Sequence, residues 1–506
     1  MTTPDRTLPD DTAATADATP ERRLHPMSWL FVLIQQLKQF ILPLLALFLF
    51  GRGDRNDLWG LVAICVLGAF SIWQYYTYRF RIGADSLQIR SGLLERSLRQ
   101  IPFARIHNVA LHQSLLHRLF GVAEVRLESA GGIKPEAEMR VLKLEDALAL
   151  EALVRHRRGA VGALAAGVPA EEGTVLHSLS TAEVVRVGLI SNRGMIVVGG
   201  GFAVLAQLGG ELFTDFITGW GILLFGVVDT YGRGHEVLAS LTLFVLFLLL
   251  VRLFSVLLAL LQYAGFRLEE HGRRLSLERG LLTRVRTSTP RRRIQSWTLR
   301  EGMLHRLFRR RTLEVGTAVL DNGSAGQPRS LREIAPVGTP ERCDALIRHL
   351  APELQWPPAE WRPLHRLTFW RLLLPQLLIA ALLAALALLS FGRLGLVFVA
   401  LWVPWIVYIT WQNARHAGYA VDARMIAARG GWWTREWRFA EIGKLQAIRF
   451  GQSPIDRRFG TAHLLLDTAG GNAMAEPLRL RFLPVAQARA LHAQLGREIA
   501  RHRLRW

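Results

Sequence analysis

The chain has 506 residues, of which 50% are hydrophobic and 20% are charged, and its mean hydropathy is +0.21. These values argue against a string of soluble domains and indicate a membrane protein. The formal net charge is +21, and the two cysteines, Cys65 and Cys343, offer neither a disulfide framework nor a metal site.

Residues 1–23 form a polar tail with no cationic stretch leading into a short apolar core, so we expect no cleavable signal peptide. After this tail one order of features recurs three times. Each copy opens on a Leu-His-x-Met/Leu-Ser/Thr motif, runs into long apolar stretches, and ends in a segment of alternating hydrophobicity. This repeat predicts three copies of one membrane-plus-domain unit. The motif histidines are His25, His177 and His365, and the hydroxyl residues expected to cap the incoming helices are Ser28, Ser180 and Thr368.

Six apolar stretches form the predicted membrane part as three hairpins, at 24–77, 176–263 and 356–411. The stretches are 41–50, 58–76, 195–208, 237–263, 372–390 and 394–411. Most are close to the ~20 residues that cross a hydrocarbon core. Residues 412–506 hold 16 basic and 7 acidic residues, whereas the first hairpin gap, 51–57, is neutral. The positive-inside tendency therefore predicts a cytoplasmic location for the soluble segments and the N-terminus.

The middle hairpin is longer than the others. Its histidine lies 103 residues before the glycine of the next strand pair, against 67 and 65 residues in the other copies. We interpret the surplus, 209–236, as a re-entrant or interfacial segment. Arg252 lies inside an apolar stretch, where a charge is costly and often functional. Its candidate intramembrane partners are Asp215 first, and also Glu211 and Asp229; alternatively the span begins later and Arg252 snorkels to the interface.

The soluble segments 78–160, 264–355 and 412–506 share one internal pattern, and residues 161–175 link the first copy to the second. Two short strands around a turn lead to Gly92, Gly280 or Gly430, and a basic residue follows 13 or 14 positions later. More strands and one amphipathic helix close each copy, at 144–156, 340–350 and 484–499. Many short strands sealed by one helix predict a small barrel with a helical plug.

The motif order "strand, Gly, Ile-Pro-x-x-Arg-Ile, Gln-Ser-x-x-x-Arg-x-Phe-Gly, strands, helix" resembles the bacterial PH-like (pleckstrin-homology-like) domain of the YdbS/YdbT family of membrane proteins. The first copy matches best, through Gln113-Ser114 and Gly121. The second copy lacks the Gln-Ser pair and has Arg309 where the others have glycine. The resemblance implies membrane α-helical hairpins combined with an α+β fold, in which three small PH-like β-barrels are each closed by a C-terminal helix. It also implies a multi-pass protein of the bacterial inner membrane.

Recurrent basic residues are the candidate contacts for anionic headgroups or for a protein partner. Each is worth ~1 kcal/mol near an anionic membrane surface. The alternative is that they are solvated or bind acids of the next barrel. A nucleic-acid partner is not expected, because the arginine runs lack interleaved aromatic residues. The seven candidates are Arg105, Arg118, Arg293, Arg306, Lys444, Arg457 and Arg458.

The repeats contain no consistent nucleophile, carboxylate pair or metal set. His235-Glu236 lacks the second histidine of a zinc helix, and the glycines at 199–201 are not followed by a phosphate-binding lysine. We therefore expect no enzyme, no cofactor and no small-molecule substrate. The sequence predicts a membrane-tethered binding or scaffold module for lipid headgroups or for a membrane or cytoplasmic protein. The alternative is a transport or envelope-stress component that uses the enlarged middle hairpin.

Overall fold

The computed structural model describes residues 22–23, 25–31, 33–34, 62, 66, 68–69, 72–73, 77–83, 86–91, 97–103, 106–129, 137–163, 173–207, 236–317, 331–365, 367–392, 394–468 and 477–501. The chain divides into two units. The first comprises residues 1–171 with 283–287, and the second comprises residues 172–282 with 288–506.

In each copy a short strand at the Leu-His motif pairs with the first strand after the apolar stretches. The antiparallel pairs are β1 (Arg22–Arg23) with β2 (Arg79–Ile82), β8 (Thr174–Ser178) with β9 (Arg267–His271), and β15 (Arg362–Pro363) with β16 (Gly418–Val421). The two ends of each apolar insertion are thereby held side by side. The boundaries drawn from the sequence left these strands out of the β segments.

The first unit contains two runs of antiparallel strands. β1, β2, β3 (Ser86–Ser91) and β4 (Ser97–Pro102) form a four-stranded sheet in that order. The next run is β5 (Ile106–Gln113), β6 (Val122–Ser129) and β7 (Ala137–Lys143), with residues 284–287 of β11 (Arg284–Pro290) paired to β5. Two helices, α3 (Leu115–Leu119) and α4 (Leu144–Ala163), complete the copy. Leu87, Leu127, Met139 and Leu150 are fully buried in its core.

The second copy lies mostly in the second unit. Its apolar part consists of α5 (Thr181–Ile190), α6 (Arg193–Gln207) and α8 (Glu236–Tyr263). Its β part consists of β9, β10 (Arg274–Arg279), η4 (Arg291–Arg293), β12 (Ile294–Glu301), α9 (Met303–Leu307), β13 (Arg311–Thr317), β14 (Glu333–Gly338) and α10 (Pro340–Leu350). The predicted helix 340–350 is confirmed, and Thr339 caps it by accepting from the Arg342 N–H at 3.3 Å.

The third copy repeats this order. The helices α11 (Thr368–Phe391) and α12 (Leu394–His416) pack together as an antiparallel pair. The β part follows as β16, β17 (Met425–Gly430), β18 (Arg435–Glu441), η5 (Ile442–Lys444), β19 (Leu445–Gly451), α13 (Pro454–Phe459), β20 (Thr461–Thr468), β21 (Leu478–Pro484) and α14 (Val485–Arg501).

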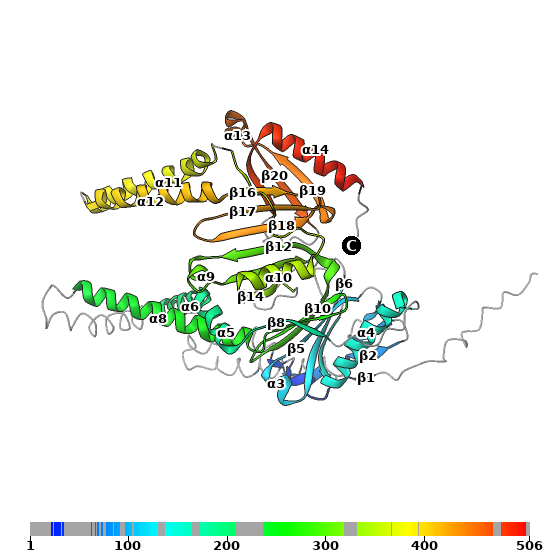
Figure 1. Cartoon of the computed structure of the whole chain (residues 1–506). Coiled ribbons are helices and arrows are strands. Elements are labelled where there is room, and N and C mark those ends of the chain that lie inside the picture. The colour runs from blue at the N-terminus through cyan, green and yellow to red at the C-terminus, as the bar shows by residue number, and fades with distance from the viewer. Residues whose placement is uncertain are drawn as a thin grey trace, which may run out of the picture. The chain divides into compact units, whose positions relative to one another are not determined.

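One seven-stranded sheet joins the second copy to the third. Its order is β14-β13-β12-β18-β17-β16-β15, and the joint is the antiparallel pairing of β12 with β18 (Figure 1). Trp297 of β12 stacks on Phe439 of β18, which also stacks on Trp356 at a ring distance of 4.2 Å. The joint therefore lies in a hydrophobic core that both copies share.

The expected antiparallel sheets and C-terminal helices are present, but barrel closure is not shown. The strand β18 pairs with β12 of the preceding copy, while β19 begins a separate sheet in the order β19-β20-β21. Each copy thus divides its strands between two open sheets. The hydrophobic pattern predicts which face of a strand is buried, but it does not predict which copy provides the neighbouring strand.

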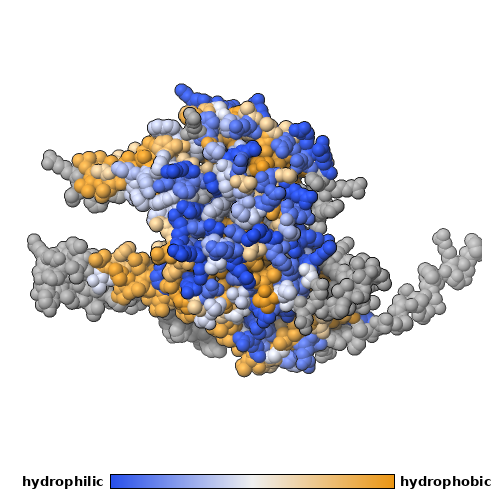
Figure 2. All heavy atoms as spheres, viewed as in Figure 1, coloured by the Kyte–Doolittle hydropathy of each residue, from blue (hydrophilic) through white to orange (hydrophobic). Residues whose placement is uncertain are grey.

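Two described helices are long and apolar enough to cross a membrane, with the apolar spans Phe244–Tyr263 in α8 and Thr368–Leu389 in α11. Within the second unit, α8 and the α11–α12 pair leave the sheets on the same side (Figure 1). Figure 2 shows hydrophobic residues gathered over these helices and hydrophilic residues over the sheets. The predicted count of six spans is not confirmed, because 41–50 and most of 58–76 lie outside the described residues.

The capping prediction is confirmed at one of the three copies. Ser180 caps α5 by accepting from the Glu183 N–H at 3.3 Å. At α11 the prediction is wrong, because the N-cap is Leu367 and the buried Thr368 hydroxyl has no hydrogen-bond partner among the described residues. The Ser28 hydroxyl is buried in the same way. In both cases the turn is closed instead by the histidine, whose Nδ1 accepts from the N–H two residues later.

Candidate functional site

Close packing of helices positions a pocket in the second copy. Gly188 of α5 and Gly194 of α6 lie against α8, where a Cβ would overlap the backbone of Val256 or Val251. The Gly194 N–H also donates to Ser255 Oγ of α8 at 2.8 Å. Glycine at these positions lets the helices approach closely. The break between α5 and α6, at residues 191–192, lies against α8 and lines the pocket.

Arg252 of α8 binds the end of α5. Its Nη1 donates to Leu189 O at 3.2 Å, to Ser191 O at 3.1 Å and to Asn192 Oδ1 at 3.0 Å. The two backbone carbonyls are acceptors that a helix leaves unsatisfied at its C-terminus. Arg252 lies within the apolar span, and its role is to hold the α5–α6 break against α8. The predicted pair with Asp215 is not tested, because Asp215 lies outside the described residues.

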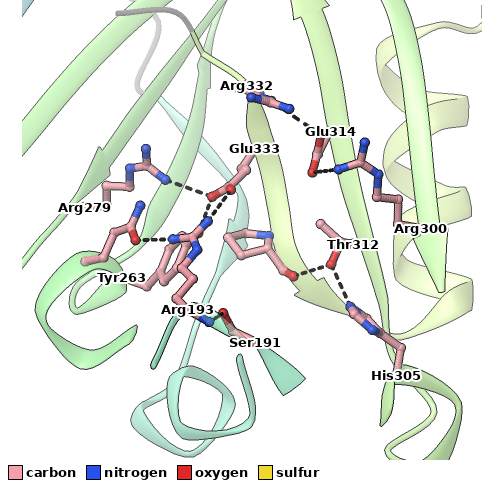
Figure 3. A network of polar contacts seen from close by, with 12 residues as sticks. Ser191, Arg193, Tyr263, Arg279, Arg300, His305, Thr312, Glu314, Arg332 and Glu333 are labelled. Atoms are coloured by element: carbon pink, nitrogen blue, oxygen red, sulfur yellow. Dashed lines mark hydrogen bonds and ion pairs between the residues drawn. The ribbon is translucent and has the colours of Figure 1, made fainter. Parts of the chain in front are cut away.

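The carboxylate of Glu333, at the start of β14, joins three segments that are distant in sequence (Figure 3). Arg193 Nη2 lies 3.1 Å from Oε1, Arg279 Nη1 lies 3.0 Å from Oε2, and the Tyr263 hydroxyl donates to Oε2. Burial alone would raise the pKa of Glu333, but Arg279, Arg193 and the hydrogen bonds lower it. The carboxylate is therefore ionised, and it neutralises part of the charge of both guanidinium groups.

A second group of polar residues lies on the other side of this network (Figure 3). Arg300 of β12 pairs with Glu314 at 3.0 Å and with Glu436 of β18 at 3.0 Å. The Thr312 hydroxyl donates to Pro336 O at 2.8 Å, so it accepts from His305 Nε2 at 3.1 Å. Burial lowers the pKa of His305, and Glu301 opposes this shift. A neutral imidazole with the proton on Nε2 fits these bonds.

Together these residues line the second-copy pocket, which has a volume of about 650 Å³. Its charged lining residues are Arg193, Arg252, Arg300, Glu314 and Glu333, and its apolar lining includes Val187, Ile190, Met303, Leu304 and Trp433. Because each of Arg193 and Arg300 already has a carboxylate partner, most of the positive charge in this pocket is compensated by the protein itself.

Another pocket, which also adjoins the apolar helices and the last strand of its copy, lies in the third copy, with a volume of about 390 Å³. It is defined here as the third-copy pocket. The first turns of α11 and the end of α12 form one wall, and β17, β18 and β21 form the other. Its basic lining residues are Arg429, Arg438, Arg479 and Arg481, and its lining residues among those described include one acid, Glu436.

Arg429 in this pocket lacks the partner that its counterpart has. Arg279 and Arg429 both precede the glycine that follows the strand pair, and Glu333 and Leu478 both begin the strand before the C-terminal helix. Arg279 pairs with Glu333, whereas the third copy has Leu478 at the position of Glu333, and Leu478 lines the same pocket as Arg429. Arg429 has no hydrogen bond or ion pair with the described residues, and its Nε is buried. Its guanidinium lies over the Trp361 ring at 4.8 Å, and burial lowers its pKa.

Aromatic residues gather where the helices of the third copy meet the sheet. Trp405, Tyr408 and Trp411 of α12 contact one another or the pair Trp432 and Trp433, at ring distances of 5.4 to 6.5 Å. Trp405, Tyr408, Trp411 and Trp433 are all more than 40% exposed. Amphipathic rings of this kind are typical of the membrane–water interface.

The predicted basic contacts that are described in the second unit do not form one cluster. Arg118, Arg457 and Arg458 are exposed on α3 and α13, and Arg293 is buried in η4. Arg306 donates to Trp432 O at 2.7 Å and to Trp433 O at 3.0 Å. Lys444 donates to Ile294 O at 2.9 Å across the β12–β18 joint and pairs with Glu441. Arg105 lies outside the described residues, so a role of these residues in ligand contact stays a prediction.

The Gln-Ser…Phe-Gly motif stabilises a turn. Gln113 and Gln452 each donate from Nε2 to the carbonyl nine residues later, at 3.1 and 3.0 Å. The following serines, Ser114 and Ser453, cap the short helix. The final glycine has φ of +63° in copies one and three, and Arg309 adopts φ of +51° at that position in copy two. The motif therefore marks the fold and not a ligand site.

Sequence reasoning missed the residues of both pockets. Arg193 stands directly before an apolar stretch, and Arg429 stands directly before the glycine of its strand pair, so the local sequence could have marked both as candidate site residues. No local pattern marks Glu333 or Leu478, because Glu333 contacts Arg193 across 140 residues of chain. In the part of the chain that is described, no group of three or more His, Cys, Asp or Glu residues could hold a metal ion. The alternative of transport through 209–236 also concerns residues outside that part.

Comparison with known proteins identifies the repeats. Residues 32–158, 221–349 and 373–499 each match the family described as "Bacterial PH domain". The chain is 24% identical over 310 residues to the "UPF0699 transmembrane protein YdbT" of Bacillus subtilis (strain 168), covering 57% of this chain and 60% of that protein. The chain thus spans less than two thirds of that relative's length. No solved structure matches the chain.

Proposed function

Because the chain belongs to the bacterial PH domain family, we propose that it is a membrane-tethered binding module whose third-copy pocket holds the headgroup of an anionic lipid. The proposed role is binding, without catalysis. In this proposal the protein lies in the bacterial inner membrane with its β parts on the cytoplasmic side. The spans bring the pocket to the headgroup layer, where an anionic lipid meets it without first leaving the bilayer.

The uncompensated Arg429 is the observation that carries the proposal. Arg429 is half-buried, and its Nε is shielded from water without a hydrogen-bond partner among the described residues, so a phosphate would supply the missing charge and hydrogen bonds. Arg429 lies beside Arg438, Arg479 and Arg481 in the same pocket. Gly418 makes room for it, since a Cβ there would come within 3.2 Å of Arg429 Nε.

The walls of the pocket favour a lipid over a free phosphate. One wall is formed by the first turns of α11, the helix with an apolar span, through Leu372 and Gln376. Leu364, just before this helix, extends the same wall. The acyl chains of a lipid bound here would continue along α11 and α12, whose side chains at Leu378, Leu382 and Trp402 are exposed. A soluble anion would leave that apolar surface unused.

Lipid-dependent stabilisation of the full-length protein tests the proposal. Protein in a neutral detergent is heated with phosphatidylglycerol or with phosphatidylcholine, and we expect only the anionic lipid to raise the unfolding midpoint. Arg429→Gln should abolish this rise, because the phosphate loses its partner. The same variant should not lower the midpoint of the lipid-free protein, since Arg429 makes no hydrogen bond or ion pair with the described residues that the change would remove. This second readout separates lost binding from lost folding.

Leu478→Glu supplies the acid that the second copy has, with Leu478→Gln as the neutral control of equal size. We expect Leu478→Glu to weaken phosphatidylglycerol binding about tenfold or more, which corresponds to about 1.4 kcal/mol, and Leu478→Gln to retain binding. Arg457→Gln with Arg458→Gln tests the exposed α13 instead. Retained binding in both Arg429→Gln and Leu478→Glu, or lost binding in the α13 variant alone, would exclude the third-copy pocket.

A further inference from the structure

Two incomplete sheets lie at the two ends of the repeat array. The sheet β1-β2-β3-β4 ends at β4, and the sheet β19-β20-β21 ends at β19, with no further strand paired to either edge among the described residues. The seven-stranded sheet of the second unit combines three strands of one copy with four of the next. The two end sheets have the same three and four strands. We propose that separate molecules of this chain join end to end, with β19 of one molecule paired antiparallel to β4 of the next.

The joints inside the chain define how this pairing would be registered. In the first joint Gln113 lies opposite Arg284, and in the second Glu301 lies opposite Arg435. Gln113 and Glu301 both stand directly before the capping residue of the short helix. The arginine lies nine residues before the basic residue at the end of the 3-10 turn in both η4 and η5. Both joints therefore have one register.

The free edges carry the same markers. Gln452 stands directly before the capping residue Ser453, and Arg96 stands nine residues before Arg105. Transferring the register places Phe450 opposite Leu98 and Arg449 opposite Arg99. The markers that accompany both internal joints are thus retained in the sequence beside the two unpaired edges.

The exposure of side chains on β4 and β19 indicates that each edge lacks a neighbouring strand. Leu98 of β4 is 70% exposed, and residues 97–100 are all exposed. In the second joint Trp297 and Leu299 of β12 are at most 3% exposed, whereas their counterparts in β19, Ile448 and Phe450, are only half-buried. An unpaired strand edge with an exposed leucine is a pairing site. Because the β4 edge and the β19 edge are different surfaces, the contact between them repeats from molecule to molecule and produces a ring or a row.

One predicted contact is repulsive and makes the register testable. Arg449 would lie opposite Arg99, and like charges directly opposite one another weaken a strand pair. Both side chains are exposed in the separate edges. Arg449→Glu should therefore increase the fraction of associated chains, and adding Arg99→Glu to it should reverse that gain.

Disulfide cross-linking between differently tagged full-length chains tests the proposal. In a Cys65→Ser, Cys343→Ala background, one chain carries Arg449→Cys and the other carries Arg99→Cys. Opposed Cα atoms in antiparallel strands lie about 4.5–5.5 Å apart, which a disulfide spans. Mild oxidation in membranes should link the two tags, and a chain with both cysteines should form a ladder of multimers.

Gln100→Cys replaces Arg99→Cys in the matched control, because its side chain points to the opposite face of β4. We expect the control to lose the link. The proposal is overturned if the two tags do not link while both variants unfold at the wild-type temperature. It is equally overturned if the control links as well, or if the double-cysteine chain closes only on itself.

Discussion

The pockets of the second and third copies both lie between the apolar helices and the last strand of the β part, but they differ in their charge balance. In the second copy, Glu333 compensates Arg193 and Arg279, so the pocket is held together by its own ion pairs. In the third copy Leu478 stands at the position of Glu333, and the partner of Arg429 within the described part of the chain is the Trp361 ring. The difference shows that repetition preserves a backbone, while one side chain decides whether an arginine at the end of the strand pair is compensated by the protein itself.

The largest expected effect comes from giving the second copy the leucine of the third. Glu333→Leu leaves Arg193 and Arg279 without their carboxylate, and removing one partner of a buried ion pair costs about 3–5 kcal/mol. Chemical unfolding of the detergent-solubilised chain, followed by tryptophan fluorescence, measures the loss. Glu353→Leu breaks the exposed pair with Arg424 and should cost less than about 1 kcal/mol. Equal losses in the two variants would contradict the assigned role of Glu333.

A smaller effect is expected where the membrane helix meets the short motif helix. In the third copy Arg371 of α11 pairs with Asp456 of α13 at 2.6 Å, whereas in the second copy Glu183 of α5 faces Arg310 at 3.7 Å. Asp456→Asn should cost about 2 kcal/mol, as for hydrogen bonds to a charged group. Glu183→Gln should cost less, and thermal unfolding at neutral pH compares the two.

The pH dependence of Asp456 has a defined sign. Burial opposes ionisation, but hydrogen bonds from Ser453, Thr461 and Arg371 lower the pKa of Asp456 to about 2. Its stabilising contribution is therefore complete above the ordinary value of 3.8 and is lost as the pH falls through about 2. The difference between wild type and Asp456→Asn should shrink on acidification. Asp467→Asn, at an exposed position, is the control and should show no such change.

The smallest expected effect concerns the turn after the short helix. Arg309 adopts φ of +51° where the first and third copies have glycine. Arg309→Gly should stabilise the second copy by about 1 kcal/mol, because glycine adopts this conformation without a steric cost. The reverse change, Gly460→Arg, should destabilise the third copy by a similar amount, and unfolding midpoints of both variants check the pair. A loss of stability in Arg309→Gly would show that the arginine side chain has a role at this position.

The sequence alone determined the elements of this protein. The spacing of the Leu-His motifs predicted three copies, Thr339 and Pro340 predicted the start of α10, and the resemblance to bacterial PH-like domains is confirmed by three family matches. These features are local in the chain, or they recur in it at a fixed distance. Periodicity and capping chemistry are therefore sufficient to find them.

Only the tertiary structure decided how the copies share their strands and which charges remain uncompensated. The pairing of β12 with β18, and the presence or absence of an acid opposite Arg279 and Arg429, depend on residues tens to more than a hundred positions apart. Alternation of apolar residues is the same whether a strand pairs within its own copy or with the next. The sequence likewise does not indicate which carboxylate will pair with a given arginine, because the two residues come close only when the sheets form.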